Sequence, residues 1–94
     1  MKDQINGAIA AWDDSGVGDP LVLIHGLSES RAAWQHQSQE LSKHFRVISY
    51  DVRGFGESEL GVAEGRPQQF ASDLAGLLSN LGVDRARLWG FSMG

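Results

Sequence analysis

The stretch Gly90-Phe91-Ser92-Met93-Gly94 has the spacing G-x-S-x-G. This spacing is typical of a sharp turn between a strand and a helix that presents a nucleophilic serine at its tip. Large side chains beside the serine would crowd such a strained backbone, so glycine is favoured on both sides. Ser92 is therefore the candidate nucleophile. It needs a base for its proton, and hydrogen-bond donors for the charge that develops on an attacked carbonyl oxygen.

Upstream of this turn, four short apolar segments have the composition of β-strands. Leu21–Ile24 is a continuous branched apolar run, typical of a central parallel strand buried on both faces, and Pro20 suits its first position. The other predicted strands are Ile5–Trp12, ended by a turn at 13–16, then Phe45–Tyr50, and Ala86–Trp89, which leads into the serine turn.

A first helix is predicted between the strands at 21–24 and 45–50. Ser30 is a suitable N-cap for this helix, which we expect to run from residue 31 to about His44. Its apolar residues predict a buried face that contains Ala33, Trp34 and Leu41.

A second helix is predicted to follow a loop at 61–65. Pro67 suits its first turn, and Gly82 suits its C-terminal stop. Between them, apolar side chains recur at helical spacing at Phe70, Leu74, Leu77, Leu78 and Leu81.

The alternation of strands and helices predicts an α/β fold with a mostly parallel sheet and helices on both faces. Functional sites in such sheets lie outside the carboxyl ends of the strands. Three stretches are expected there, namely 25–28, 51–58 and 90–94.

Composition narrows the possible partners and compartment. The chain has 94 residues, 41% of them apolar, and a formal net charge of -4 with its basic residues scattered. We therefore expect neither nucleic acid nor a membrane surface as a partner. The absence of cysteine excludes disulfides and thiolate catalysis. We identify neither a signal peptide nor a membrane-spanning run, and expect a cytoplasmic protein.

Three motifs together resemble those of the α/β-hydrolase superfamily. They are Leu21–Gly26, Asp51–Ser58 and Gly90–Gly94, which stand in that family's order and with its spacing. The resemblance implies the N-terminal portion of an α/β-hydrolase fold, and is closest to 3-oxoadipate enol-lactonases and non-haem haloperoxidase-like esterases. It implies hydrolysis of a small-molecule carboxylic ester or lactone, with no metal and no organic cofactor.

The resemblance also implies roles for individual residues. Ser92 matches the family's nucleophile, whereas haloalkane dehalogenases and epoxide hydrolases place an aspartate at that position. The backbone N–H groups of Leu27 and Met93 match the oxyanion hole. Gly90 and Gly94 match the glycines of the nucleophile turn.

His25 and Gly26 match the pair that shapes the oxyanion loop in the family. A catalytic base or a metal ligand is the alternative interpretation of His25. We favour the structural role, because the family's base lies further along the chain. His36 and His44 would lie about 12 Å apart along a helix, too far to share a metal, so we expect them on the surface.

The family's triad runs serine, then aspartate or glutamate, then histidine, and neither partner follows Ser92 here. We therefore expect residues 1–94 to be a single incomplete domain of a longer hydrolase, inactive alone, whose acid and base lie beyond residue 94. An exposed sheet edge beside Leu88 would favour self-association of such a fragment. The alternatives are a non-catalytic protein that binds a small molecule and an inactive truncated remnant.

The loop 51–58 also carries Gly54-Phe55-Gly56, which invites a dinucleotide-binding interpretation. The third glycine of G-x-G-x-x-G would fall at Glu59, so that fingerprint is not met. We expect this loop to supply turn geometry and a hydrogen-bond network of Asp51 or Arg53. The three tryptophans are expected in packing roles, with Trp34 the one that could approach a pocket.

Overall fold

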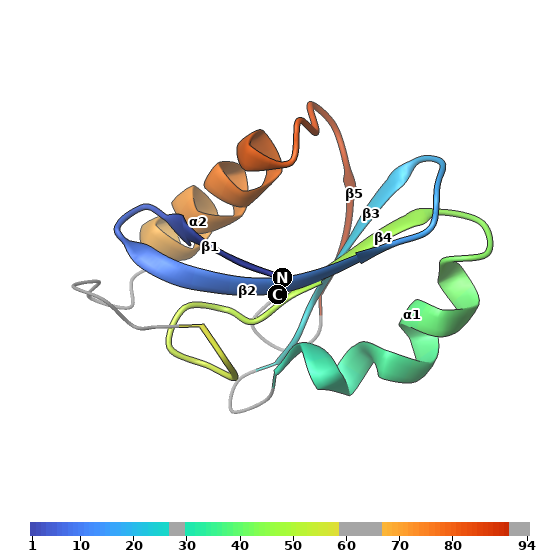
Figure 1. Cartoon of the computed structure of the whole chain (residues 1–94), viewed down its shortest axis with the longest axis horizontal. Helices are drawn as coiled ribbons and strands as arrows, with labels where there is room; N and C mark the ends of the chain where they lie inside the picture. Colours follow the sequence, from blue (N-terminus) through green and yellow to red (C-terminus); the bar gives the residue numbers. More distant parts are fainter. Residues whose placement is uncertain (27–29, 59–66, 91–94) are drawn as a thin grey trace.

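The computed structural model describes residues 1–26, 30–58 and 67–90 (Figure 1). The strands are β1 (Lys2–Ile5), β2 (Ala8–Ser15), β3 (Pro20–Ile24), β4 (Arg46–Tyr50) and β5 (Arg87–Gly90). The helical segments are η1 (Arg31–Trp34), α1 (Gln35–Leu41) and α2 (Pro67–Asn80).

The strands form one mixed sheet in the order β1-β2-β4-β3-β5. The pairs β1/β2 and β2/β4 are antiparallel, whereas β3 pairs in parallel with β4 on one side and with β5 on the other. Helices α1 and α2 cover opposite faces of this sheet (Figure 1). The predicted α/β fold is therefore confirmed, and β3 is its central parallel strand.

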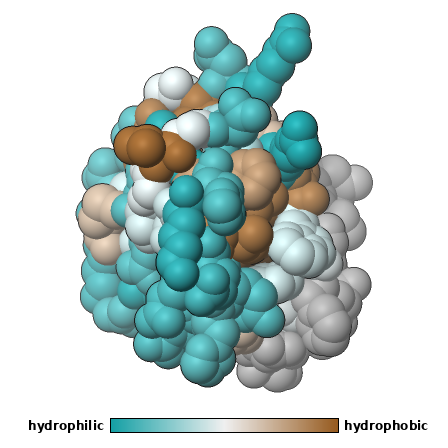
Figure 2. All heavy atoms as spheres, turned by 90° about the vertical axis from the view of Figure 1, so that its right-hand side faces the viewer, coloured by the Kyte–Doolittle hydropathy of each residue, from teal (hydrophilic) through white to brown (hydrophobic). Residues whose placement is uncertain are grey.

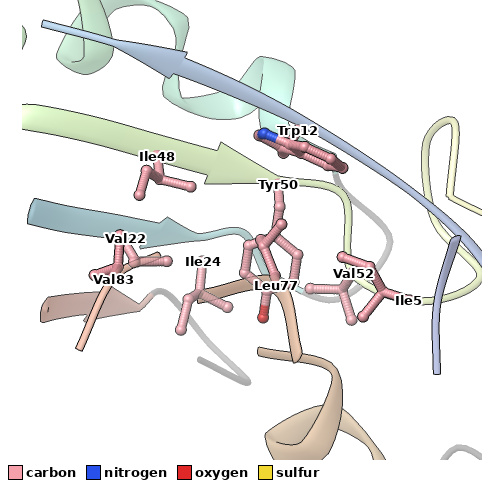
Figure 3. Packing of buried hydrophobic residues seen from close by; sticks show 9 residues of the cluster. All are labelled: Ile5, Trp12, Val22, Ile24, Ile48, Tyr50, Val52, Leu77 and Val83. Carbon is pink, nitrogen blue, oxygen red and sulfur yellow. The ribbon is translucent and has the colours of Figure 1, made fainter. Parts of the chain in front are cut away.

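The face of the sheet under α2 carries the larger core. Val22 and Ile24 of β3 and Ile48 of β4 pack there with Leu77 of α2 (Figure 3). Partly buried α2 residues that pack against this core are Phe70, Leu74 and Leu78, with Leu81 just after the helix. The helical spacing of these residues therefore predicted the buried face of α2.

The opposite face of the sheet carries a smaller core. Leu21 and Leu23, which alternate with Val22 and Ile24 along β3, pack there with Trp34 and Val47. A strand that buries both of its faces needs apolar residues at consecutive positions. The run at 21–24 meets this requirement, which is why it predicted a central strand.

The N-terminal region differs from the prediction of one strand at 5–12. Two antiparallel strands, β1 and β2, are joined by Asn6-Gly7, whose φ angles are 51° and 84°. Positive φ at both central residues is the requirement of a two-residue type I′ hairpin turn, for which Asn-Gly is the preferred pair. Strand β2 also continues to Ser15 instead of ending at residue 12, because Trp12–Ser15 pair with β4.

The first helix is shorter than predicted. Ser30 is its N-cap, as expected, and accepts a hydrogen bond from the backbone N–H of Ala32 at 3.3 Å. The helix begins as the 3₁₀ segment η1, and α1 ends at Leu41 instead of near residue 44. Trp34 is buried and Leu41 is half-buried, as predicted, but Ala33 is exposed. A 3₁₀ helix has three residues per turn, so its side chains point in other directions than those of the predicted α-helix.

The surface around α1 is mainly hydrophilic (Figure 2).

Helix α2 begins at Pro67, as predicted, and Gly82 follows its last turn with φ +70°. The N–H of Val83 donates to the carbonyl of Leu78 at 2.9 Å, which satisfies one of the free carbonyl groups at the end of the helix. Within the described ranges, neither α1 nor α2 is long and apolar enough to cross a bilayer.

Truncation of Leu77 tests the core under α2. Leu77 is 1% exposed, so we expect Leu77→Ala to lower the free energy of unfolding by about 2–5 kcal/mol. Denaturant unfolding measures this change. Val17→Ala is the control, because Val17 is 86% exposed and its truncation should change stability by less than about 0.5 kcal/mol. Equal losses in the two variants would contradict this assignment of the core.

Candidate active site

The carboxyl ends of β3, β4 and β5 lie at one edge of the sheet. Ile24 pairs with Tyr50 of β4 and with Gly90 of β5, so these three residues are at the same level. The described residues 25–26 and 51–58 therefore follow their strands at the same edge, as predicted. The predicted site residues Ser92, Met93, Gly94 and Leu27 lie outside the described residues, whereas His25, Gly26 and Gly90 lie within them.

His25 is fully buried, and both of its ring nitrogens are hydrogen-bonded. The backbone N–H of Val52 donates to Nε2 at 2.9 Å, which requires an unprotonated Nε2. The proton is therefore on Nδ1, which donates to the Gly26 carbonyl oxygen at 2.8 Å. The edge of the Phe55 ring also contacts the imidazole, with centroids 5.7 Å apart. A histidine held in this way supports the predicted structural role and has no free nitrogen for a base or a metal.

Asp51 supplies a second buried anchor at this edge. Asp51 is 2% exposed. Its carboxylate accepts hydrogen bonds from the backbone N–H of Arg31 at 2.7 Å and from that of Glu57 at 2.8 Å. The Nη1 group of Arg31 forms an ion pair with the same carboxylate. A buried carboxylate is tolerated when it is paired and hydrogen-bonded, and Asp51 meets both conditions.

The Arg31 guanidinium links three carboxylates. Besides Asp51, it binds Asp13 through Nε at 3.0 Å and Glu57 through Nη2 at 2.8 Å. Burial lowers the pKa of Arg31, but hydrogen bonds to Glu57 and Asp13 and the nearby negative charges raise it above its ordinary value. The pKa of Glu57 is lowered, first by its hydrogen bond with Lys2 and then by that with Arg31.

The turn after β4 is shaped to receive the Asp51 carboxylate. A Cβ atom at Gly56 would lie 2.4 Å from Asp51 Oδ2, and Gly56 has φ +52°, so only glycine fits at this position. Ser58 donates to the Asp51 carbonyl oxygen at 2.6 Å and accepts the N–H of Ala11 at 2.9 Å. The glycines of this loop therefore serve turn geometry and the predicted hydrogen-bond network.

Arg53 forms a separate network on the α2 side of the sheet. Its Nε and Nη2 atoms bind the two carboxylate oxygens of Asp73 at 2.7 Å each, and Nη2 also donates to the Asn6 carbonyl at 3.1 Å. Burial raises the pKa of Asp73, but hydrogen bonds from Arg53, Gln69 and Asn6 lower it below its ordinary value. Burial, with the charge of Asp73 as a smaller cause, raises the pKa of Tyr50 to about 12.

The remaining candidate residues have packing or surface positions. Trp12 and Trp34 are buried, and Trp34 lies with its ring centroid 5.9 Å from that of Trp89, which is 49% exposed. His36 and His44 are exposed, as predicted. Across the described residues, no group of three or more histidine, aspartate or glutamate side chains could hold a metal ion.

A hollow lies where the α1 face of the sheet meets the loop after β4. It has a volume of about 590 Å³. Its lining includes Asp13 and Ser49 from the sheet, Arg31 and Gln35 from η1 and α1, and Asp51, Gly56 and Glu57 from the predicted motif at 51–58. Among the described residues, neither His25, Gly26 nor Gly90 lines it. The hollow thus borders one of the three predicted motifs, whereas the strand topology defines the edge at which β3, β4 and β5 all end.

Sequence reasoning did not find the role of Arg31. A signal for it existed, because a positive charge in the first turn of a helix opposes the helix dipole. Such a charge is tolerated when acidic side chains lie close to it, as Asp13, Asp51 and Glu57 do here. The acidic partners come from β2 and from the loop after β4, and only the folded sheet brings them together.

The Arg53–Asp73 pair predicts a defined pH dependence of stability. Because the folded-state pKa of Asp73 is lowered, its contribution is fully present above the unfolded-state pKa of about 4 and is lost as the pH falls below it. We expect Asp73→Asn to lower the free energy of unfolding by about 1.5–3 kcal/mol at pH 7, since it removes the charged acceptor of the Arg53 hydrogen bonds in a half-buried pair. Denaturant unfolding from pH 7 to pH 3 should show the difference from the wild type shrinking below about pH 4. A difference that stays constant or grows would contradict this account.

Comparison with known proteins agrees with this geometry. A family model described as alpha/beta hydrolase fold matches residues 19–94. The (E)-2-((N-methylformamido)methylene)succinate hydrolase of Acinetobacter baylyi is 37% identical over 89 residues, which are 95% of this chain and 34% of that protein. A soluble epoxide hydrolase of Corynebacterium sp. is 36% identical over 90 residues, 96% of this chain and 32% of that protein.

Among solved structures, the enol-lactonase from Burkholderia xenovorans superposes with a TM-score of 0.94 at 33% identity. The match covers 99% of this chain and 37% of the enol-lactonase chain. The chain thus spans about a third of the length of these relatives. The match over residues 19–94 agrees with the strand order of the sheet and with the edge that carries the motifs. The chain belongs to the α/β-hydrolase fold family.

Proposed function

We propose that this chain is the N-terminal part of a longer serine hydrolase that cleaves a carboxylic ester or lactone. In this proposal Ser92 is the nucleophile, and the backbone N–H groups of Leu27 and Met93 form the oxyanion hole. The acid and the base of the triad lie beyond residue 94, and the chain alone is inactive. The similarity to an enol-lactonase over 99% of the chain supports a lactone or related ester as the substrate class.

The observation that carries the proposal is the parallel pairing of β3 with β5. Ile24 is the register partner of Gly90, so two neighbouring strands end side by side at the same edge. Leu27 follows Ile24 by three residues, and Ser92 follows Gly90 by two. Adjacent strands lie about 4.8 Å apart, so a nucleophile and an oxyanion donor that leave them at one level can meet the same carbonyl group.

The proposed reaction has two steps. Ser92 Oγ attacks the carbonyl carbon while its proton passes to the histidine base. The bond between the carbonyl carbon and the ester oxygen then breaks, the histidine gives its proton to that oxygen, and an alcohol or enol group forms together with the acyl-enzyme. Water, deprotonated by the same histidine, then attacks the acyl carbon and releases the acid and the free serine. The oxyanion hole stabilises the negative charge that develops on the carbonyl oxygen in both steps.

The serine also bears on the choice between ester and epoxide chemistry, because an epoxide hydrolase is among the relatives. Opening of an epoxide through an ester intermediate needs a carboxylate nucleophile. Residue 92 is a serine, which supports acyl transfer. In the same way, the buried and fully hydrogen-bonded His25 supports a base located elsewhere in the whole protein.

The test uses the whole protein that contains this chain. Its gene should continue beyond codon 94 and encode an acidic residue followed by a histidine. We expect the protein to hydrolyse p-nitrophenyl acetate and to react with a fluorophosphonate probe, and Ser92→Ala to lose both properties. The control is Ser79→Ala, an exposed serine on α2 that should leave both unchanged.

Other results would overturn the proposal. Labelling that persists in Ser92→Ala would place the nucleophile elsewhere. A ligand that raises the melting temperature of the wild type without being hydrolysed, together with no fluorophosphonate labelling, would support a non-catalytic binding protein instead.

A further inference from the structure

The connection between β3 and η1 is tied at both of its ends to two consecutive residues after β4. At its start, His25 accepts the N–H of Val52 at 2.9 Å. At its end, the N–H of Arg31 donates to Asp51 Oδ1 at 2.7 Å. Residues 51 and 52 therefore hold the two ends of one connection, although they lie 20 and 27 positions further along the chain than the residues that they bind.

Both anchors are buried and held by more than one hydrogen bond. His25 is fully buried, and Gly26 and Val52 occupy its two nitrogens. The Asp51 carboxylate is buried as well and accepts the N–H of Glu57 at 2.8 Å in addition to its bonds with Arg31. Hydrogen bonds to a charged acceptor are about twice as strong as neutral ones, so Asp51 is the stronger anchor.

We propose that Asp51 is a positioning residue of the hydrolase reaction, which fixes the β3–η1 connection by holding the backbone N–H of Arg31. This inference rests on the proposed function, because the connection carries the N–H of Leu27 that we assign to the oxyanion hole. Asp51 does not contact the substrate in this proposal. It acts through the backbone that begins at Gly26 and ends at Arg31.

A positioning role and a purely structural role predict different kinetics. An oxyanion donor binds the transition state more strongly than the ground state, so its displacement lowers kcat and leaves KM nearly unchanged. A purely structural residue changes the fraction of folded enzyme and leaves kcat per active site unchanged. The fluorophosphonate end point counts active sites and thus separates the two effects.

Asp51→Asn and Asp73→Asn form a matched pair. Each replaces an aspartate that is paired with an arginine, buried in the case of Asp51 and half-buried in the case of Asp73. The side chain of Asp73 binds Arg53, Asn6 and Gln69, which lie outside residues 25–31. In the whole protein, we expect Asp51→Asn to lower kcat per active site by up to about 10²-fold, with KM within twofold of the wild type. Asp73→Asn should retain the wild-type kcat per active site.

A second pair of variants separates the effect of the Arg31 backbone N–H from that of its side chain, and it can be measured even if Asp51→Asn does not fold. Arg31→Ala and Arg31→Pro both remove the guanidinium, but only proline removes the N–H that Asp51 accepts. Proline is tolerated at the first position of a helix, and Ser30 before it is already extended, with φ -151° and ψ 178°. We expect Arg31→Pro to have a kcat per active site at least tenfold below that of Arg31→Ala.

The outcomes separate this inference from the proposed function. A wild-type protein that neither labels at Ser92 nor hydrolyses the ester overturns both. A wild type that does so, with equal kcat per active site in Arg31→Pro and Arg31→Ala, overturns the role of Asp51 alone. So does an Asp51→Asn variant whose kcat per active site matches that of Asp73→Asn.

Discussion

Burial of β3 on both faces and on both edges is the constraint on which the other elements depend. The strand pairs with β4 and β5, and its alternate side chains enter two separate cores. Polar side chains are therefore costly along 21–24, and the first polar side chain after the strand, that of His25, marks the point where the chain leaves the sheet. The position of the candidate site follows from this change from apolar to polar residues.

The polar groups at that edge are buried as well, but each has partners. His25 and Asp51 use backbone N–H groups and a guanidinium to satisfy their acceptors, and Gly56 leaves the space that the carboxylate needs. Such a network specifies one conformation of the surrounding turns, because a half-satisfied arrangement would leave a buried charge. Hydrogen bonds thus hold both His25 and Asp51 in place at this edge.

Local patterns predicted what depends on local physics. The apolar run at 21–24, the Ser30 cap and the spacing around Leu77 were sufficient for the central strand, a helix start and a buried helical face. The hairpin at Asn6-Gly7 differs from the predicted single strand although its turn signal is local, because apolar residues continue on both sides of the turn. The end of the first helix was misplaced because a 3₁₀ start changes which residues face the core.

Contacts between distant segments could not be predicted in the same way. Arg31 and Asp51 are 20 positions apart, and Arg53 meets Asn6 from 47 positions away. Their pairing depends on the order of strands in the sheet, which hydrophobic periodicity does not determine. For the site, the motifs predicted the edge that carries it, a structural role for His25 and a hydrogen-bond network of Asp51 or Arg53. The partners of these residues, among them Arg31 and Asp73, emerged only from the fold.

The ring contact between Trp34 and Trp89 has an optical consequence. The two indoles are 5.9 Å apart and tilted by 43°, a geometry in which their electronic transitions couple. One ring belongs to η1 and the other to β5, so the coupling exists only while the last strand is seated beside the first helix. Near-ultraviolet circular dichroism would therefore carry a built-in signal for the docking of β5, independent of the helical signal from α2.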